Sequence, residues 1–232
     1  MPDIAVLIPC YNEEATIASV ARDFANILPG AQVYVFDNNS TDASAARAAE
    51  GGAKVRAEPQ QGKGHVVRRA FADIEADIYV LVDGDGTYDA ASAPALVRAL
   101  SEGPFDMVNA ARVEKNAAAY RRGHRFGNWI ISWAVGFLFG RKFQDVLSGY
   151  RAFSRRFVKS FPALARGFEI ETELTVHALQ LRLPVKEIET PYRERPEGSF
   201  SKLNTFRDGA RILLTIFYLA KEEKPLAFFG VI

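Results

Sequence analysis

Short apolar runs alternate with helical patterns through the first hundred residues of this 232-residue chain. The pattern predicts strands at 4–8, 33–36, 54–56 and 78–82, separated by helices at 13–28, 41–50 and 64–74. Ile78–Val82 is apolar throughout, which is typical of a strand that is buried on both faces of a sheet. Repeated strand–helix–strand units join parallel strands through right-handed crossovers. The chain is therefore expected to form a single α/β domain, with a mainly parallel sheet flanked by helices.

The second half of the chain follows a less regular pattern. It predicts strands at 105–109 and 185–188 and helices at 169–181 and 204–221. Phe126–Gly140 is strongly apolar but only 15 residues long, whereas a helix that spans a membrane needs about 20. Trp129 and Trp133 would lie on one face of this stretch if it is helical. It fits a helix that lies in the plane of a membrane interface, and a buried core helix is the alternative.

Basic residues are concentrated in the middle of the chain. The whole chain has 29 Lys and Arg against 28 Asp and Glu, a balance that argues against a general nucleic-acid-binding protein. The segment 112–166 holds 12 of these cations and only two acids, Glu114 and Asp145, which gives it a net charge of +10. Such a segment attracts phosphate groups or an anionic membrane surface. A solvated basic surface is the alternative.

The cysteine content and the first residues bear on the cellular compartment. Cys10 is the single cysteine, which excludes an internal disulfide framework and a cysteine-based zinc site. Met1-Pro2-Asp3 leads directly into the first predicted strand, without the pattern of a signal peptide. The active portion of the chain is therefore expected to work in the reducing cytoplasm.

Polar clusters follow three of the predicted strands, at 9–13, 37–42 and 83–85. The carboxyl ends of parallel strands form the ligand-binding edge of such a sheet. Asp83 and Asp85 come directly after the buried strand, and their two hard oxygen ligands can hold Mg²⁺ or Mn²⁺ while leaving positions for phosphate oxygens. Asp-Gly pairs are also common in turns, but the position after a core strand favours a metal site.

Two further residues near this edge indicate nucleotide binding. Asp37 ends the second predicted strand, from where a carboxylate can accept hydrogen bonds from a base or a ribose. Lys63 stands between Gly62 and Gly64 at the start of a predicted helix, which suits a phosphate cradle. The spacing of a P-loop is absent. No Gly-x-Gly-x-x-Gly follows the first strand, so a nicotinamide-dependent dehydrogenase is excluded.

In their order along the chain, these motifs resemble those of the inverting glycosyltransferases of family 2, which have the GT-A fold. The motifs are VLIPCYNEE at 6–14, DNNSTD at 37–42, GKG at 62–64, DGD at 83–85, QDVLSGYR at 144–151 and YRERPEGSFSK at 192–202. Within the family the similarity is greatest to the polyprenyl-phosphate sugar transferases of the dolichol-phosphate mannose synthase type, and it covers nearly the whole chain. One motif departs from that pattern. Gly86-Thr87-Tyr88-Asp89 stands where the lipid-linked enzymes often have Gln-His-Pro-Pro, so a third metal ligand from a glutamine is not implied.

The resemblance implies a role for each residue that matches a family motif. The nucleotide-sugar pocket would comprise Pro9, Tyr11, Glu13, Asp37, Lys63, Asp83, Gly84 and Asp85. Asp83 and Asp85 are the implied ligands of Mg²⁺ or Mn²⁺. Asp145 matches the family's acidic residue near the acceptor and is the implied catalytic base. The acceptor phosphate or the leaving diphosphate would meet Arg112, Arg125, Arg195 and Lys202.

Asp145 is the only acidic residue between Glu114 and Arg166. The cations nearby are expected to keep its carboxylate ionised. A phosphate acceptor is already anionic and hardly needs deprotonation, so Asp145 is expected to orient the acceptor more than to abstract a proton. A structural aspartate that caps the turn before Ser148 is the alternative.

The expected function is the inverting, metal-dependent transfer of a sugar from a UDP- or GDP-linked donor to a polyprenyl phosphate, such as undecaprenyl or dolichyl phosphate, at the cytoplasmic face of a membrane. Residues 1–110 would bind the nucleotide sugar and 111–220 the acceptor, with 121–142 as a basic and apolar interfacial segment. The apolar run 226–232 leads us to expect that 221–232 begins a truncated, membrane-proximal segment. A soluble or growing glycan acceptor and a non-catalytic nucleotide-binding module are the alternatives.

Overall fold

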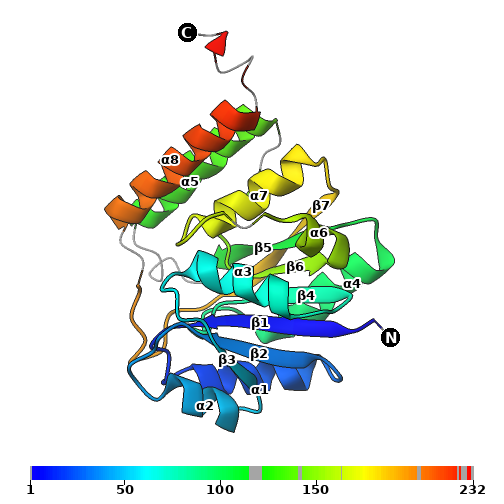
Figure 1. Ribbon diagram of the computed structural model, residues 1–232, viewed down its shortest axis with the longest axis vertical. Helices are drawn as coiled ribbons and strands as arrows, with labels where there is room; N and C mark the ends of the chain where they lie inside the picture. The colour runs from blue at the N-terminus through cyan, green and yellow to red at the C-terminus, as the bar shows by residue number, and fades with distance from the viewer. Residues whose placement is uncertain are drawn as a thin grey trace.

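The computed structural model describes residues 2–114, 122–140, 143–162, 164–202, 205–223, 225 and 229–230, and at 114, 122–126, 205–206 and 223 it describes the backbone alone. The strands are β1 (Ile4–Cys10), β2 (Gln32–Asp37), β3 (Lys54–Ala57), β4 (Ile78–Leu81), β5 (Met107–Glu114), β6 (Arg151–Ser154) and β7 (Val185–Tyr192). The α-helices are α1 (Ile17–Ile27), α2 (Ser44–Glu50), α3 (Lys63–Asp73), α4 (Ala93–Glu102), α5 (Arg122–Phe139), α6 (Arg155–Ser160), α7 (Ile170–Gln180) and α8 (Thr205–Glu223). They form one sheet with helices on both of its faces (Figure 1).

The seven strands form a mixed sheet in the order β3-β2-β1-β4-β6-β5-β7. Strand β1 is parallel to β2 and β4, β2 is parallel to β3, and β5 is parallel to β7. Strand β6 is antiparallel to its neighbours β4 and β5. The mainly parallel sheet expected from the sequence is confirmed, and β6 is the strand that the pattern did not predict. Its pairing sets Arg151 opposite Leu81, which brings the loop before β6 beside the end of β4.

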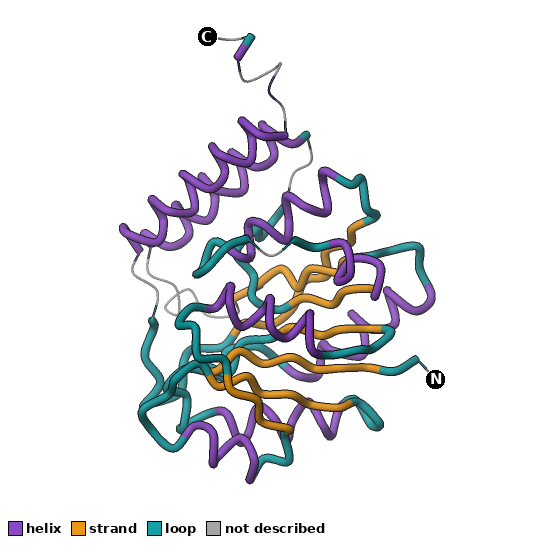
Figure 2. The backbone as a smooth tube through the Cα atoms, in the orientation of Figure 1, coloured by secondary structure: helices purple, strands orange, loops and turns teal. Residues whose placement is uncertain are grey.

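Alternate residues of the central strands enter two separate hydrophobic cores. From β1, Leu7 enters the first core, and Val6 and Ile8 enter the second. Helices α3, α6 and α7 cover the first face of the sheet, and α1, α2 and α4 cover the second (Figure 2). Because β4 is covered on both faces, all of its residues are buried. This burial explains its continuous apolar sequence.

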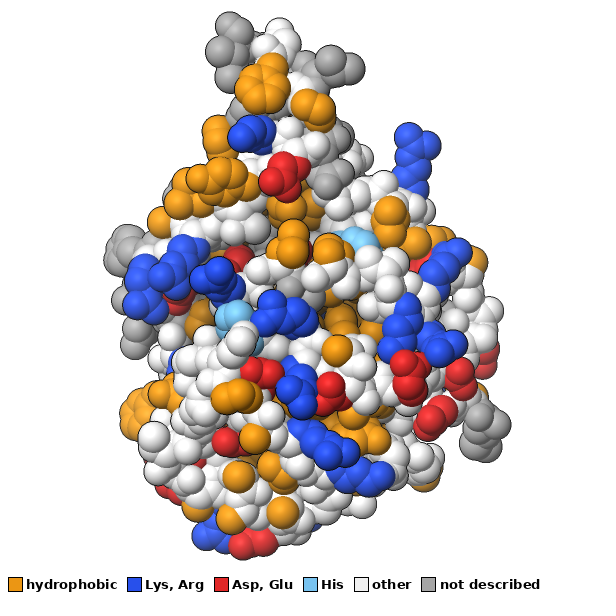
Figure 3. All heavy atoms as spheres, in the orientation of Figure 1, with side chains coloured by type: hydrophobic (Ala, Val, Ile, Leu, Met, Phe, Trp, Pro, Cys, Tyr) orange, Lys and Arg blue, Asp and Glu red, His pale blue; other side chains and the backbone are white. Residues whose placement is uncertain are grey.

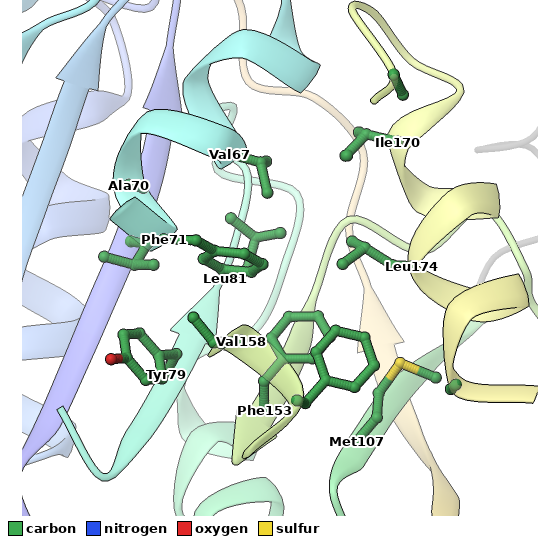
Figure 4. Close-up of a cluster of buried hydrophobic side chains, with 14 of the residues drawn as sticks. Val67, Ala70, Phe71, Tyr79, Leu81, Met107, Phe153, Val158, Ile170 and Leu174 are labelled. Carbon is green, nitrogen blue, oxygen red and sulfur yellow. The ribbon is translucent and has the colours of Figure 1, made fainter. Parts of the chain in front are cut away.

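The first core joins α3, β4, β6 and α7. Figure 4 shows Phe71 of α3 and Phe153 of β6 near Leu81 of β4, and the two rings meet edge to face with centroids 5.7 Å apart. Ile170 and Leu174 of α7 close the core from the other side (Figure 4). Burying each such side chain contributes about 1.5–3 kcal/mol. The core therefore fixes α3 and α7 relative to the end of β4.

Helices α5 and α8 lie side by side at one end of the molecule, beyond α7 (Figure 1). Both contact α7, and the first core receives Ile131 and Val135 from α5 and Ile212 and Ile216 from α8. The apolar stretch 126–140 is thus part of a helix that packs on the core along one side. No described helix is both long and apolar enough to cross a membrane.

Several boundaries differ from the sequence-based expectation. The helix expected at 13–28 begins at Ile17, after a turn in which the Thr16 amide donates to the Glu13 carbonyl oxygen at 3.0 Å. Strands β5 and β7 extend to Glu114 and Tyr192, well beyond the predicted ends, because the two strands pair with each other along their whole length. Helix α4 has no counterpart among the predicted elements.

Candidate active site

The loops after β1, β2 and β4 meet at the carboxyl edge of the sheet. The Asn12 amide donates to Ser40 Oγ at 2.9 Å, and Thr16 Oγ1 donates to the Gly84 carbonyl oxygen at 2.6 Å. Asn12 and Asn39 have φ values of 51° and 61°, in the left-handed region that Asn tolerates better than most residues. These contacts bring the three predicted polar clusters into one site.

The predicted nucleotide residues Pro9, Tyr11 and Asp37 lie on the β1–β2 side of this site. In the register of the two strands, Pro9 is opposite Phe36 and Asp37 is opposite Cys10. Asp37 Oδ1 is buried and has no hydrogen-bond partner among the described residues. A buried acceptor without a donor is costly, so this oxygen suits a ligand hydroxyl or N–H group.

The glycines on either side of Lys63 allow two segments of backbone to approach closely. A Cβ at Gly62 or Gly64 would collide with the backbone of 165–166, and the Gly64 amide donates to the Arg166 carbonyl oxygen at 3.1 Å. On the other side, Asn38 donates to two carbonyl oxygens of the loop 58–60 and accepts from the Gly62 amide at 2.7 Å. The described contacts of both glycines are thus with other parts of the protein, and phosphate binding by this motif stays a prediction.

The ammonium group of Lys63 lies between two carboxylates. Its Nζ is 2.5 Å from Asp83 Oδ1 and also pairs with Glu171, in the first turn of α7. Burial acts to lower the pKa of Lys63, but the two carboxylates outweigh it and the pKa is raised. Asp83 also lies directly against Gly149, where a Cβ would collide with the carboxylate. Sequence reasoning did not single out Glu171.

Asp85 is buried and is contacted from two sides. Arg195 Nη2 is 2.6 Å from Oδ2, and Thr87 donates to Oδ1 from its amide at 3.1 Å and from its hydroxyl at 2.6 Å. Each of the two predicted metal ligands thus has a cationic partner, Lys63 for Asp83 and Arg195 for Asp85. Within the described ranges, no three His, Cys, Asp or Glu side chains form a complete metal-binding cluster.

The segment after β7 returns to the β1 loop. Lys202 Nζ is 2.6 Å from Glu13 Oε1 and 2.9 Å from the Asn12 carbonyl oxygen, and Ser199 Oγ donates to Glu13 Oε2 at 3.4 Å. Burial raises the pKa of Glu13, and Lys202 opposes this in part. Arg195 and Lys202, which the motifs associate with phosphate binding, therefore lie on the carboxylates of the donor-side loops.

Asp145 is buried and forms a two-point ion pair with Arg112. Arg112 Nε is 2.6 Å from Oδ2 and Nη2 is 2.8 Å from Oδ1, while Asn128 of α5 donates to Oδ1 at 3.1 Å. Burial acts to raise the pKa of Asp145, but the Arg112 guanidinium outweighs it and the pKa is lowered. The carboxylate is therefore held ionised. Arg125, the remaining predicted acceptor cation, lies outside the described side chains.

Arg151 holds the loop that carries Asp145. Its side chain is fully buried and donates to the Ser148 carbonyl oxygen at 2.9 Å, to the Val146 carbonyl oxygen at 2.5 Å and to Thr175 Oγ1 at 2.8 Å. Sequence reasoning counted Arg151 among the 12 cations of the basic segment 112–166 and did not predict that it is buried. Its place at the start of an apolar strand was the available signal, because a cation there is costly unless it is fully paired.

The family model of glycosyl transferase family 2 matches residues 5–161. The chain belongs to this family. The match includes β1 to β6, the loops that carry Asp37, Asp83 and Asp85, and the segment from Asp145 to Arg151. The family resemblance drawn from the sequence motifs is confirmed.

Relatives from Haloferax volcanii are similar to this glycosyltransferase over nearly its whole length. Glycosyltransferase AglJ is 38% identical over 236 residues, which cover 99% of this chain and 76% of the relative. A dolichyl-phosphate hexose transferase is 30% identical over 222 residues, which cover 96% of each chain. The family and these relatives establish the chain as a glycosyltransferase enzyme.

Solved structures agree on the fold. Glucosyl-3-phosphoglycerate synthase from Mycobacterium tuberculosis, solved in complex with Mn²⁺, UDP and glucosyl-3-phosphoglycerate, matches with a TM-score of 0.76. The match covers 94% of this glycosyltransferase and 80% of that chain at 24% sequence identity. The expected GT-A fold is confirmed.

Proposed function

We propose that this glycosyltransferase transfers a hexose, with inversion, from a nucleoside-diphosphate sugar to a polyprenyl phosphate at the cytoplasmic face of a membrane. The two-sided character of α5 carries the proposal. One side supplies Asn128 to Asp145, and the other exposes Trp129, Trp133 and Phe137, with 62%, 57% and 74% of their surfaces accessible. An apolar acceptor that bears a phosphate would use both sides of such a helix. The relative named as a dolichyl-phosphate hexose transferase supports this choice of acceptor.

The neighbouring helix α8 also has exposed apolar residues, and we call these and the exposed apolar residues of α5 the α5–α8 surface. It consists of Trp129, Trp133, Phe137, Leu213, Leu214, Phe217 and Tyr218. The rings of Trp133 and Phe137 stack with centroids 5.4 Å apart, and hydrophobic side chains are visible over α8 near the top of Figure 3. Aromatic residues of this kind suit the interface between lipid headgroups and acyl chains. A soluble acceptor would give this surface no use.

In this proposal the donor would bind to the half formed by 1–110. The unpaired Asp37 Oδ1 would accept a hydrogen bond from the base or ribose, with Pro9, Tyr11 and Glu13 on the same side of the site. Lys63, Asp83, Gly84 and Asp85 would lie along the diphosphate. The M. tuberculosis protein that was solved with UDP and Mn²⁺ supports a donor of this chemical class.

The residues at the end of β4 fit Mg²⁺ or Mn²⁺ by their chemistry. Asp83 and Asp85 supply carboxylate oxygens, the ligands that these cations prefer. Since the described residues contain no cluster of three candidate ligands, the diphosphate oxygens of the donor would complete the coordination. The bound cation would neutralise charge on the leaving diphosphate.

In the proposed reaction, an oxygen of the acceptor phosphate bonds to the anomeric carbon of the sugar. The bond from that carbon to the diphosphate oxygen breaks, and its electron pair leaves with the nucleoside diphosphate. Arg112 would bind and orient the acceptor phosphate. Its guanidinium group is held in a fixed plane by the two-point contact with Asp145. Arg195 and Lys202 would turn from the donor-side carboxylates to the diphosphate. Because the acceptor is anionic, Asp145 need not accept a proton, and its lowered pKa suits a positioning role.

A lipid-linked assay tests this function. Radiolabelled UDP- and GDP-hexoses are incubated with Mn²⁺ and with liposomes of anionic lipid that contain a short polyprenyl phosphate. We expect label in the lipid fraction for at least one donor. We also expect the double variant Trp133→Ser/Phe137→Ser to float less with the liposomes and to lose about tenfold or more of this activity.

Leu181→Ser is the matched control, because Leu181 is also exposed but lies at the end of α7. It should float and turn over like the wild type. Equal flotation of all three proteins, or label transferred only to a water-soluble glycan, would contradict the lipid acceptor and favour a soluble one.

A further inference from the structure

Glu171 connects to the donor site through Lys63. Its carboxylate pairs with Lys63, whose Nζ is 2.5 Å from Asp83 Oδ1. The side chains of Lys63 and Glu171 are both enclosed, with exposed fractions of 10% and 6%. The row Asp83–Lys63–Glu171 thus links the end of β4 to the first turns of α3 and α7.

Glu169 and Glu173, the neighbouring glutamates of Glu171, bind backbone amides of the loop before α7. Glu173 accepts hydrogen bonds from the amides of Leu164 and Ala165, each at 2.8 Å, and Glu169 accepts from the amides of 166–167. Because 169 and 173 are one helical turn apart, both face this loop, whereas Glu171 projects from another side of α7. Glu171 is therefore set apart from the acids that support the backbone.

The sharing of one ammonium group by two carboxylates determines the charge at Asp83. With all three groups ionised, the row carries a net charge of −1. An enclosed lysine with one carboxylate partner would largely neutralise the charge of that partner, because the attraction is strong where water is excluded. When a second carboxylate pairs with the same ammonium group, the charge of the first is neutralised less completely. Asp83 then keeps negative charge for a further cation.

We infer that Glu171 is a positioning residue of the donor site, which shares Lys63 with Asp83 and so keeps Asp83 able to bind the divalent cation that accompanies the nucleoside diphosphate. The inference rests on the proposed function, because it requires Asp83 to meet that cation. Without the Glu171 charge, Asp83 would be the one described carboxylate partner of Lys63, and the row would become neutral. Mutation of a residue that contacts a metal ligand typically lowers metal affinity by about 10–100-fold.

Calorimetry on the full chain tests this role, with UDP and GDP as probes, each with and without Mn²⁺. Glu171→Gln keeps the shape of the side chain and removes its charge. It should weaken the Mn²⁺-dependent binding of the nucleotide that the wild type prefers by about tenfold or more. In a Lys63→Met background the same substitution should change that affinity by less than about twofold, because the ammonium that Glu171 redirects is gone. A purely structural role would not depend on Lys63 in this way.

Glu173→Gln is the matched control, because Glu173 lies on the same helix, is also buried, and contacts the loop 164–165. It should lower the melting temperature and leave the Mn²⁺-dependent affinity within about twofold of wild type. Should Glu171→Gln fail to fold, Glu171→Asp retains the charge with a shorter reach and should show an intermediate loss.

The outcomes separate this inference from the function on which it rests. Wild-type Mn²⁺-dependent affinity in a folded Glu171 variant, or an equal loss with and without Lys63, would overturn the positioning role and leave the proposed function standing. Failure of the wild type to bind either nucleotide with Mn²⁺ would overturn the proposed function, and the positioning role with it.

Discussion

Arg112 donates to both carboxylate oxygens of Asp145, from Nε at 2.6 Å and from Nη2 at 2.8 Å. Its guanidinium carbon also lies over the ring of Tyr192, 5.3 Å from the centroid. The two-point contact fixes the plane of the guanidinium group. Asp145 therefore fixes the orientation of the Arg112 guanidinium group, and a fixed orientation is what binding a phosphate at a defined position requires.

Asp145→Asn should bind the donor nucleotide normally and lose about 10²-fold or more in turnover, the effect expected when a reacting group is misplaced. A neutral amide cannot hold Arg112 by two charged contacts, so acceptor binding would lose its orientation. Steady-state kinetics with varied acceptor, beside calorimetry with the nucleotide, separates the two effects. A wild-type rate would show that the ion pair serves the fold alone.

The pH dependence of the same pair has a defined sign. The folded-state pKa of Asp145 is lowered, because Arg112 outweighs the effect of burial. Its stabilising contribution is therefore complete above about pH 5 and is lost only as the pH falls through the lowered pKa. Turnover should accordingly show no inflection from Asp145 between about pH 5 and pH 8.

Asp85→Ala should abolish turnover, and Asp83→Ala should weaken nucleotide binding as well. Both carboxylates lie at the end of β4, where oxygen ligands would hold the divalent cation against the diphosphate. Calorimetry should show that wild-type nucleotide affinity depends on Mg²⁺ or Mn²⁺ and that this dependence is reduced in both variants. Full activity of Asp85→Ala in excess chelator would end the metal hypothesis.

Gly64→Ala should reduce the free energy of unfolding by about 1–3 kcal/mol, because the new Cβ would collide with the backbone of 165–166. Gly209→Ala is the matched control within a helix, since a Cβ there meets nothing within 4 Å. That control should gain about 0.5–1 kcal/mol from the better helix propensity of alanine. Urea unfolding of both variants checks the contrast, and equal stabilities would contradict the close contact.

Cys10 should be unreactive in the native state. The side chain is 2% exposed, and burial is the main cause that raises the pKa of its thiol to about 12. A thiol-specific reagent at neutral pH should label the chain only after denaturation, because the thiolate is the reacting form. Rapid labelling of the native protein would show that the β1 end opens.

The sequence predicted those elements whose residue pattern indicates burial or position in the sheet. The apolar run of β4 indicated burial on both faces, and Asp37, Asp83 and Asp85 could be placed at one edge because parallel strands end together. Strand β6 was harder to predict, because it has only four residues and begins with the charged residue Arg151. Its antiparallel pairing depends on neighbours far away in the chain, which no local pattern contains.

Buried charges were the other source of error. The sequence did not indicate that Arg151 and Glu171 are buried, because a charged residue is expected to be exposed unless its partner is known. Their partners, Thr175 and Lys63, lie on other elements and meet them only in the folded chain. The ion pairs that Lys202 and Arg195 form with Glu13 and Asp85 could not be predicted for the same reason. They join the segment after β7 to loops more than 100 residues earlier in the sequence.

Asn128 and Trp129 are adjacent in α5, yet one contacts Asp145 and the other faces outward. The thickness of one helix, about 10 Å, thus lies between the proposed reaction centre and the α5–α8 surface. Under the proposed function, an acceptor phosphate could cross that distance while its hydrocarbon chain stays in the bilayer. Moving a single five-carbon prenyl unit into water would cost about 4 kcal/mol. An enzyme built in this way avoids that cost at every unit of the lipid.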